Sequence, residues 1–112
     1  CHMPDVLEMP YQPPIYNASP NSSTGYLYRL AGPTCLAGDI IGDYYFPQPL
    51  REGDLVIFGD MAIYTTCKNN TFNGMPLPNI WRLDPNKKLS SLTKFNYETF
   101  KRRLGSNLDV LP

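Results

Sequence analysis

The segment GYLYRLAGPTCLAGDIIGDYY, residues 25–45, decides the fold prediction because short apolar runs alternate in it with strong breakers. Over Gly25–Leu30, large apolar side chains recur at every second position, as they do on one face of a β-strand. Gly32-Pro33 interrupts the run, and small residues follow it. A second short strand is expected over Asp39–Tyr45. The segment therefore predicts a β-rich domain.

Three further strands are expected, one before this segment and two after it. Met3–Met9 carries Pro4 and is followed by Pro10, which favours a short edge strand. Asp54–Phe58 contains four consecutive large apolar residues and is expected to be the strongest strand, buried on both faces. Ile80–Leu83 is expected to be the final strand. With 12 Pro, 8 Gly, 8 Tyr and 5 Phe in the chain, this pattern is typical of an all-β domain.

One helix is expected, near the end of the chain. Asn96 suits its N-cap, and Tyr97, Phe100 and Leu104 recur at helical spacing. Gly105 suits the position just past its end.

The composition excludes several classes of function. Ten basic and ten acidic residues give a formal net charge of zero, which disfavours a nucleic-acid or anionic-membrane partner. No apolar run approaches the roughly 20 residues of a membrane span. Three cysteines without paired spacing argue against a disulfide framework and favour a cytoplasmic location.

The residue types alone favour neither a metal site nor a nucleotide site. His2 is the only histidine, and no cysteine or carboxylate pair stands near it at metal-ligand spacing, so no metal is expected. No Gly-rich phosphate loop leads into a helix. Two loops are notable: Gly32–Asp39 and Gly59–Gly74.

These loops carry a resemblance to a known family. Gly32-Pro33-Thr34-Cys35 resembles a Gly-Pro-x-Cys signature, and three further motifs follow in the same order as in that family. They are Gly53-Asp54 with its apolar run, Ala62-Ile63-Tyr64-Thr65 and Phe72-Asn73-Gly74. The ordered set resembles the C-terminal domain of the pyridoxal-phosphate-dependent ornithine and diaminopimelate decarboxylases. The opening residues 1–11, with Cys35–Asp39, resemble the carboxynorspermidine/carboxyspermidine decarboxylase branch.

The resemblance implies a fold and a domain organisation. It implies that residues 1–112 are the C-terminal β-domain of a fold-type III enzyme. Such a domain is mainly β, a Greek-key-like barrel or sandwich, here with one late helix. The cofactor lysine and most phosphate contacts of this family lie on a preceding β/α barrel, which is absent from this chain. The chain alone is therefore expected to be inactive, and a homodimer is expected to complete each active site from two subunits.

The resemblance also implies catalytic and cofactor-binding residues. Cys35 matches the cysteine that returns a proton to the substrate carbon after carbon dioxide leaves, a task that suits a thiol near neutral pH. Its alternative is a buried, packing cysteine. Tyr64 matches the tyrosine that donates a hydrogen bond to the cofactor phosphate. Its alternative is one more core aromatic.

Two acidic residues are candidates for substrate binding. Glu8 stands where diaminopimelate decarboxylases carry an arginine for the substrate's distal carboxylate, so it implies a substrate with a distal cation. Relatives carry an acid directly after the catalytic cysteine, but that position is Leu36 here. Asp39, the nearest acid, is therefore the candidate for a second amine contact. The alternatives are a surface glutamate and a structural aspartate at a dimer interface; Asp5 is a weaker candidate of the same kind.

The function implied is the decarboxylation of carboxynorspermidine or carboxyspermidine in polyamine biosynthesis, with pyridoxal phosphate supplied by the full-length enzyme. A diaminopimelate, ornithine or arginine decarboxylase is the alternative within the family, and Glu8 argues against the first. An alternative from another class is a non-catalytic β-barrel binding module. A barrel with a cofactor lysine upstream in the parent reading frame would favour the enzyme.

Overall fold

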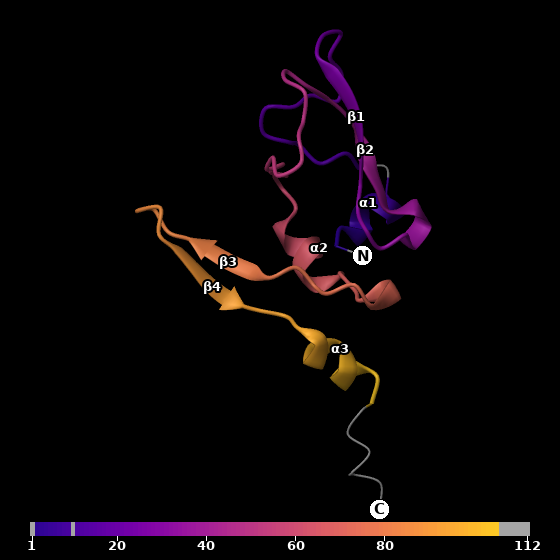
Figure 1. Cartoon of the computed structure of the whole chain (residues 1–112), viewed down its shortest axis with the longest axis vertical. Helices are drawn as coiled ribbons and strands as arrows, with labels where there is room; N and C mark the ends of the chain where they lie inside the picture. The colour runs from indigo at the N-terminus through magenta and orange to yellow at the C-terminus, as the bar shows by residue number, and fades with distance from the viewer. Residues whose placement is uncertain (1, 10, 106–112) are drawn as a thin grey trace, which may run out of the picture. The chain divides into compact units, whose positions relative to one another are not determined.

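The computed structural model describes residues 2–9 and 11–105. They belong to two compact units, Cys1–Asn70 and Thr71–Pro112, each of which we describe by itself. The elements are α1 (Pro4–Glu8), β1 (Tyr26–Ala31), β2 (Ile40–Phe46), α2 (Ala62–Cys67), β3 (Ile80–Leu83), β4 (Leu89–Thr93) and α3 (Tyr97–Arg103) (Figure 1). Short 3-10 turns cover Leu36–Asp39 and Phe72–Gly74.

An antiparallel hairpin of β1 and β2 organises the N-terminal unit. The two strands expected over Gly25–Leu30 and Asp39–Tyr45 are confirmed, each displaced by about one residue. Tyr28 lies opposite Tyr44, and the register shifts after Leu30. The sequence did not show this pairing, which brings the two ends of the intervening loop together.

The core of this unit packs on one face of the hairpin. Its buried residues are Ile15, Tyr44 and Phe46. The Tyr44 ring meets Phe58 edge-on, with 6.3 Å between centroids, and its hydroxyl donates a 2.7 Å hydrogen bond to the Pro13 carbonyl. Because Tyr44 is completely buried, this bond satisfies a hydroxyl that would otherwise be costly to desolvate.

The segment expected to be the strongest strand, Asp54–Phe58, is not a strand. Only Phe58 forms an isolated bridge, with Ile15, while Leu55 is 89% exposed. Val56 and Phe58 pack against the core, and Ile57 points outward like Leu55. The prediction of burial on both faces was wrong because this part of the chain covers only one face of the segment.

The expected strand over Met3–Met9 is also wrong, because this segment contains the helix α1. Pro4 occupies the first helical turn, where its missing N–H costs no hydrogen bond, and Asp5 adds a favourable negative charge there. The Met9 N–H donates to the Asp5 carbonyl at 3.0 Å. Figure 1 shows α1 beside α2 in this unit. Cys1 and Pro10, which belong to the opening motif, lie outside the described residues.

The C-terminal unit contains the hairpin of β3 and β4 and then α3. The expected strand at Ile80–Leu83 and the expected late helix are confirmed. The Asn96 side chain accepts a hydrogen bond from the Thr99 N–H, and the Thr99 hydroxyl oxygen accepts one from the Asn96 N–H, which completes a capping box. Sequence reasoning missed β4, since Leu89–Thr93 shows no strict alternation of apolar and polar side chains.

Candidate functional site

Cys35 lies in the loop that joins β1 to β2, Gly32–Asp39, which we call the cysteine loop. Its backbone is left-handed at four positions, with φ of 62° at Cys35, 49° at Ala37, 78° at Gly38 and 49° at Asp39. For each residue with a Cβ this conformation costs about 1–2 kcal/mol, so surrounding contacts must hold the loop in place. The loop leaves the Cys35 side chain exposed, unlike a packing cysteine.

Asp39 supplies those contacts. Its side chain is 4% exposed, and Oδ2 accepts hydrogen bonds from the Thr34 N–H at 3.0 Å and the Thr34 hydroxyl at 2.5 Å. The Asp39 carbonyl also accepts from the Gly32 N–H at 2.7 Å. A Cβ on Gly32 would lie 2.3 Å from Asp39 Oδ2, so only glycine leaves room for this carboxylate. The spacing between Gly32 and Asp39 therefore has a structural reason.

The position of Asp39 bears on its expected role. The structure places its carboxylate inside the cysteine loop, among hydrogen bonds that fix the backbone on either side of Cys35. The second amine contact expected of Asp39 stays a prediction. Its hydrogen bonds support a positioning role.

Glu8 and Tyr64 meet through a third residue, Lys68. The Lys68 ammonium forms an ion pair with Glu8 Oε2 and lies 5.5 Å from the centroid of the Tyr64 ring. Glu8 ends α1, Tyr64 lies within α2, and Lys68 caps α2 with its N–H on the Tyr64 carbonyl at 2.9 Å. Residues four apart lie on the same side of a helix, which explains why the Tyr64 and Lys68 side chains are neighbours. We call Glu8, Tyr64 and Lys68 the lysine cluster.

The lysine cluster is open to solvent. The side chains of Glu8 and Lys68 are 59% and 34% exposed, and Tyr64 is 53% exposed, unlike a core aromatic. The hydrogen bond to Glu8 raises the pKa of Lys68; desolvation opposes this, and the negative charges of Glu8 and Asp5 reinforce it. Lys68 is therefore a cation in an anionic neighbourhood at neutral pH.

Two buried oxygens lie on the helices that carry the cluster. Asp5 is 7% exposed, and its Oδ1 has no hydrogen-bond partner among the described residues. The same holds for Thr65 Oγ1 on α2. The negative charge of Asp5 raises the pKa of Lys68. Burying a carboxylate oxygen without a hydrogen-bond partner also lowers the stability of the fold.

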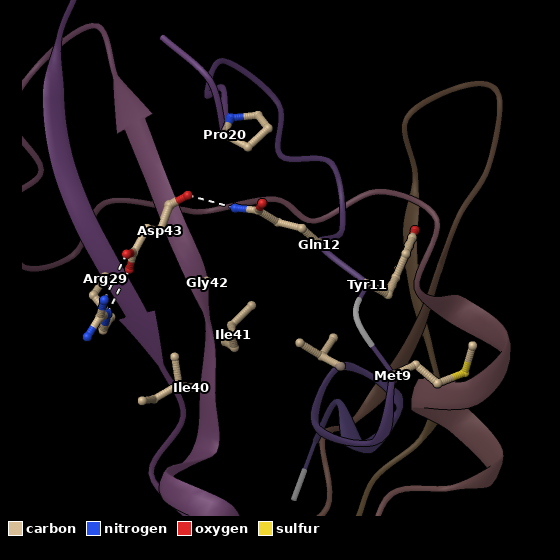
Figure 2. Close-up of a pocket in the computed structure, with 10 residues that line it drawn as sticks. Met9, Tyr11, Gln12, Pro20, Arg29, Ile40, Ile41, Gly42 and Asp43 are labelled. Carbon is tan, nitrogen blue, oxygen red and sulfur yellow. Dashed lines mark hydrogen bonds and ion pairs between the residues drawn. The ribbon is translucent and has the colours of Figure 1, made fainter. Parts of the chain in front are cut away.

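An open groove of about 680 Å³ lies beside the end of α1 and the start of β2. Met9, which follows Glu8, lies on one side of it, and Ile40, which follows Asp39, lies on the other (Figure 2). Gln12 donates a 2.7 Å hydrogen bond to the Asp43 carbonyl across the groove. The groove brings the end of α1 and the start of β2 to one surface of the N-terminal unit.

The four residues chosen from the sequence thus form two pairs, Cys35 with Asp39 and Glu8 with Tyr64. Sequence reasoning missed Lys68, which joins the second pair. Its position four residues after Tyr64 was the available signal, but it is informative only if the segment is read as a helix. A second missed residue is Thr34, whose buried hydroxyl and N–H hold Asp39.

Two kinds of feature are absent from residues 2–9 and 11–105. No group of three or more His, Cys, Asp or Glu in these ranges could hold a metal ion. No helix within them has both the length and the apolar character needed to cross a membrane.

The chain is similar to one protein family and to several known decarboxylases. Residues 1–62 match the profile of the family described as the C-terminal sheet domain of pyridoxal-dependent decarboxylases. The chain is 47% identical over 105 residues to a carboxyaminopropylagmatine decarboxylase of Synechocystis sp., covering 94% of this chain and 27% of that protein. It is 39% identical over 114 residues to a carboxynorspermidine/carboxyspermidine decarboxylase of Campylobacter jejuni, covering 92% of this chain and 30% of that protein.

A solved structure is also similar. The crystal structure of carboxynorspermidine decarboxylase complexed with norspermidine, from Campylobacter jejuni, matches with a TM-score of 0.84 and 38% identity, over 91% of this chain and 31% of that chain. The match confirms the expected C-terminal fold, although the two sheets described here are each two-stranded and do not close into a barrel. The chain spans about three tenths of the length of these relatives.

Proposed function

Because the chain belongs to the pyridoxal-dependent decarboxylases, as their C-terminal sheet domain, we propose that it is part of an enzyme that decarboxylates carboxylated polyamines. Carboxynorspermidine or carboxyspermidine is the proposed substrate, and norspermidine or spermidine the product. Residues 1–112 would be one C-terminal β-domain, and the catalytic lysine would lie on a barrel outside this chain.

The proposal rests on one agreement: the substrates in the relatives' names and the negative charge of Glu8 both indicate a polyamine precursor. The relatives at 47%, 39% and 36% identity are all named as decarboxylases of carboxylated polyamine precursors. Glu8, on the same surface as Tyr64, supplies the anion that a substrate with a distal cation requires. Both point away from diaminopimelate, whose distal end carries a carboxylate.

A second candidate substrate is carboxyaminopropylagmatine, because the relative at 47% identity bears that name. Agmatine ends in a guanidinium group, which binds a carboxylate through two parallel hydrogen bonds, whereas norspermidine ends in an ammonium group. Glu8 suits either cation. The two candidates therefore differ in how well each substrate's length and distal group suit Glu8.

The described residues fit a phosphate-bearing cofactor in one respect. The Tyr64 side chain is half exposed, so its hydroxyl is free to donate a hydrogen bond to a phosphate oxygen. We assign Tyr64 to that contact. Pyridoxal phosphate, when bound, supplies the electron withdrawal that lets carbon dioxide leave the α-carbon.

The remaining chemistry falls to this chain's own side chains. Cys35 Sγ holds a proton at the exposed surface of a stiff loop and delivers it to the α-carbon after carbon dioxide has left. Asp39 orients that loop from within. Glu8 binds the distal cation, and this contact fixes the position of the substrate and selects its length. Orientation by these groups excludes a substrate that lacks the distal cation.

The homodimer and a cytoplasmic location are further parts of the proposal. If each site combines a barrel from one subunit with this domain from the other, subunits with Cys35→Ala mixed with subunits lacking the barrel lysine should regain activity. Each hybrid dimer then keeps one intact site. Absence of recovery after proven subunit exchange would contradict a shared site. The chain alone should be inactive and form no borohydride-fixable adduct with pyridoxal phosphate.

The substrate is decided by kinetics of the full-length enzyme. We expect the highest kcat/KM on carboxynorspermidine or carboxyspermidine, measured beside carboxyaminopropylagmatine, diaminopimelate, ornithine and arginine. The guanidinium substrate in first place would establish the second candidate. Diaminopimelate, ornithine or arginine in first place would overturn the proposal.

A further inference from the structure

Lys68 forms an ion pair with the Glu8 carboxylate, the group that the proposed function assigns to the substrate's distal cation. Its ammonium is paired with Glu8 Oε2, while its backbone is held at the end of α2 by the Tyr64 carbonyl. The Tyr64 ring, 5.5 Å from Nζ, offers the same ammonium a second, weaker site. The side chain thus bridges from α2 to Glu8 on α1.

The Glu8–Lys68 ion pair is one that a competing cation can replace. With Glu8 59% and Lys68 34% exposed, water and salt screen the attraction, and pairs of this kind contribute little to stability. Lys68 has a flexible stem and keeps its charge when released into water, so displacement leaves no buried cation behind. Two cations cannot share the Glu8 carboxylate without repelling each other.

We infer that Lys68 is a built-in counter-ion of Glu8 that the substrate's distal cation must displace. This inference rests on the proposed function, because it takes Glu8 to be the distal-cation site. Lys68 then determines specificity by competition. A substrate binds only if its own cation exchanges with the lysine, so a substrate with a neutral distal end gains nothing at Glu8.

The exchange predicts that removing the charge of Lys68 strengthens substrate binding, although loss of an ion pair would ordinarily be expected to do harm. Lys68→Met keeps the length and packing of the stem and removes the charge. It frees the Glu8 carboxylate for the incoming cation. Substrate binding should therefore become tighter.

The test uses the full-length holoenzyme, with norspermidine as the probe in calorimetry. Lys68→Met should tighten norspermidine binding about 1.5- to 5-fold, the factor expected from an exposed ion pair. The change in steady-state kinetics on carboxynorspermidine should appear in KM rather than kcat. The matched control is Lys94→Met, since Lys94 Nζ also lies over an aromatic ring, 5.7 Å from the Trp81 centroid, but in the C-terminal unit. That control should bind norspermidine as the wild type does.

A double variant separates the exchange from a general charge effect. In a Glu8→Gln background, Lys68→Met should leave norspermidine binding unchanged, because there is no longer a carboxylate to compete for. Equal or weaker binding by the single variant, or an equal gain in the Glu8→Gln background, overturns the inference. If Glu8→Gln alone leaves binding unchanged, the proposed role of Glu8 fails as well. If it weakens binding and Lys68→Met does not tighten it, only the exchange fails.

Discussion

The cysteine loop and the lysine cluster place their polar groups in opposite ways. In the cysteine loop, Asp39 is buried and holds a strained backbone through Thr34, so that one exposed thiol has a fixed position. In the lysine cluster, Glu8 and Lys68 are exposed and hold each other through a pair that water weakens. A proton donor needs a fixed position, and a site for a flexible polycation needs an exchangeable partner. Four substitutions in the full-length enzyme test that contrast, starting with the largest expected effect.

Cys35→Ala should produce the largest loss. Removing the proton donor should lower kcat by about 10²- to 10⁴-fold, the usual contribution of a positioned acid, with little change in KM. Rapid-quench or steady-state assays on carboxynorspermidine measure both constants. Cys67→Ala is the control, because Cys67 is also a free, exposed cysteine but lies at the end of α2. Unchanged turnover in Cys35→Ala would make the cysteine loop a structural feature only.

Glu8→Gln should have the next largest effect and should act on binding. It keeps the shape of the side chain and removes the charge that pairs with the distal cation. In the enzyme–substrate complex, where the bound substrate shields the pair from water, this should cost about 2–5 kcal/mol, or roughly 1.5 to 4 orders of magnitude in kcat/KM. Glu52→Gln, in an exposed turn, is the control. Near-normal efficiency would show that Glu8 is a solvated residue at the end of α1.

Asp39→Asn tests whether the cysteine loop needs its buried charge. The carboxylate accepts two hydrogen bonds from Thr34, and a neutral amide accepts them more weakly, so the loop should lose about 1–2 kcal/mol. We expect kcat to fall about tenfold with a smaller change in KM, and thermal stability to fall. Asp54→Asn is matched, since that carboxylate also accepts from a backbone N–H, at 2.8 Å from Arg51, in an exposed turn. A change confined to KM would instead indicate direct substrate contact by Asp39.

The smallest effect is expected at Arg29 and Asp43, a cross-strand ion pair at the groove. The hydrogen bond from Arg29 holds the pKa of Asp43 below its ordinary value, with burial opposing it. Because the folded pKa is the lower one, the stabilisation is present above the ordinary carboxyl pKa and is lost as the pH falls through the folded value. Arg29→Gln should therefore lower the thermal midpoint slightly at pH 7, and by progressively less as the pH falls through the folded pKa of Asp43. A large effect at pH 7 would mean that this pair, like Asp39, acts as a structural anchor.

The sequence by itself determined the features that depend on neighbours along the chain. Alternating side chains located β1, and Asn96 with the helical spacing after it located α3, because caps and periodicity are local properties. The ordered motifs also carried the family, for which the residue types and their order were sufficient. The roles of Cys35, Tyr64 and Glu8 that the same motifs imply stay predictions.

Tertiary structure decided what depends on contacts between distant residues. Four apolar residues at Leu55–Phe58 are not a buried strand, because only one face meets the core. Asp39 was predicted as a second amine contact from its place in the chain near Cys35, and only folding showed that its carboxylate accepts hydrogen bonds from Thr34. Lys68 had no visible role until α1 and α2 came together and placed its ammonium on Glu8, 60 positions away in the chain. Burial and ion pairing are set by the partner that packing supplies, and no local pattern encodes that partner.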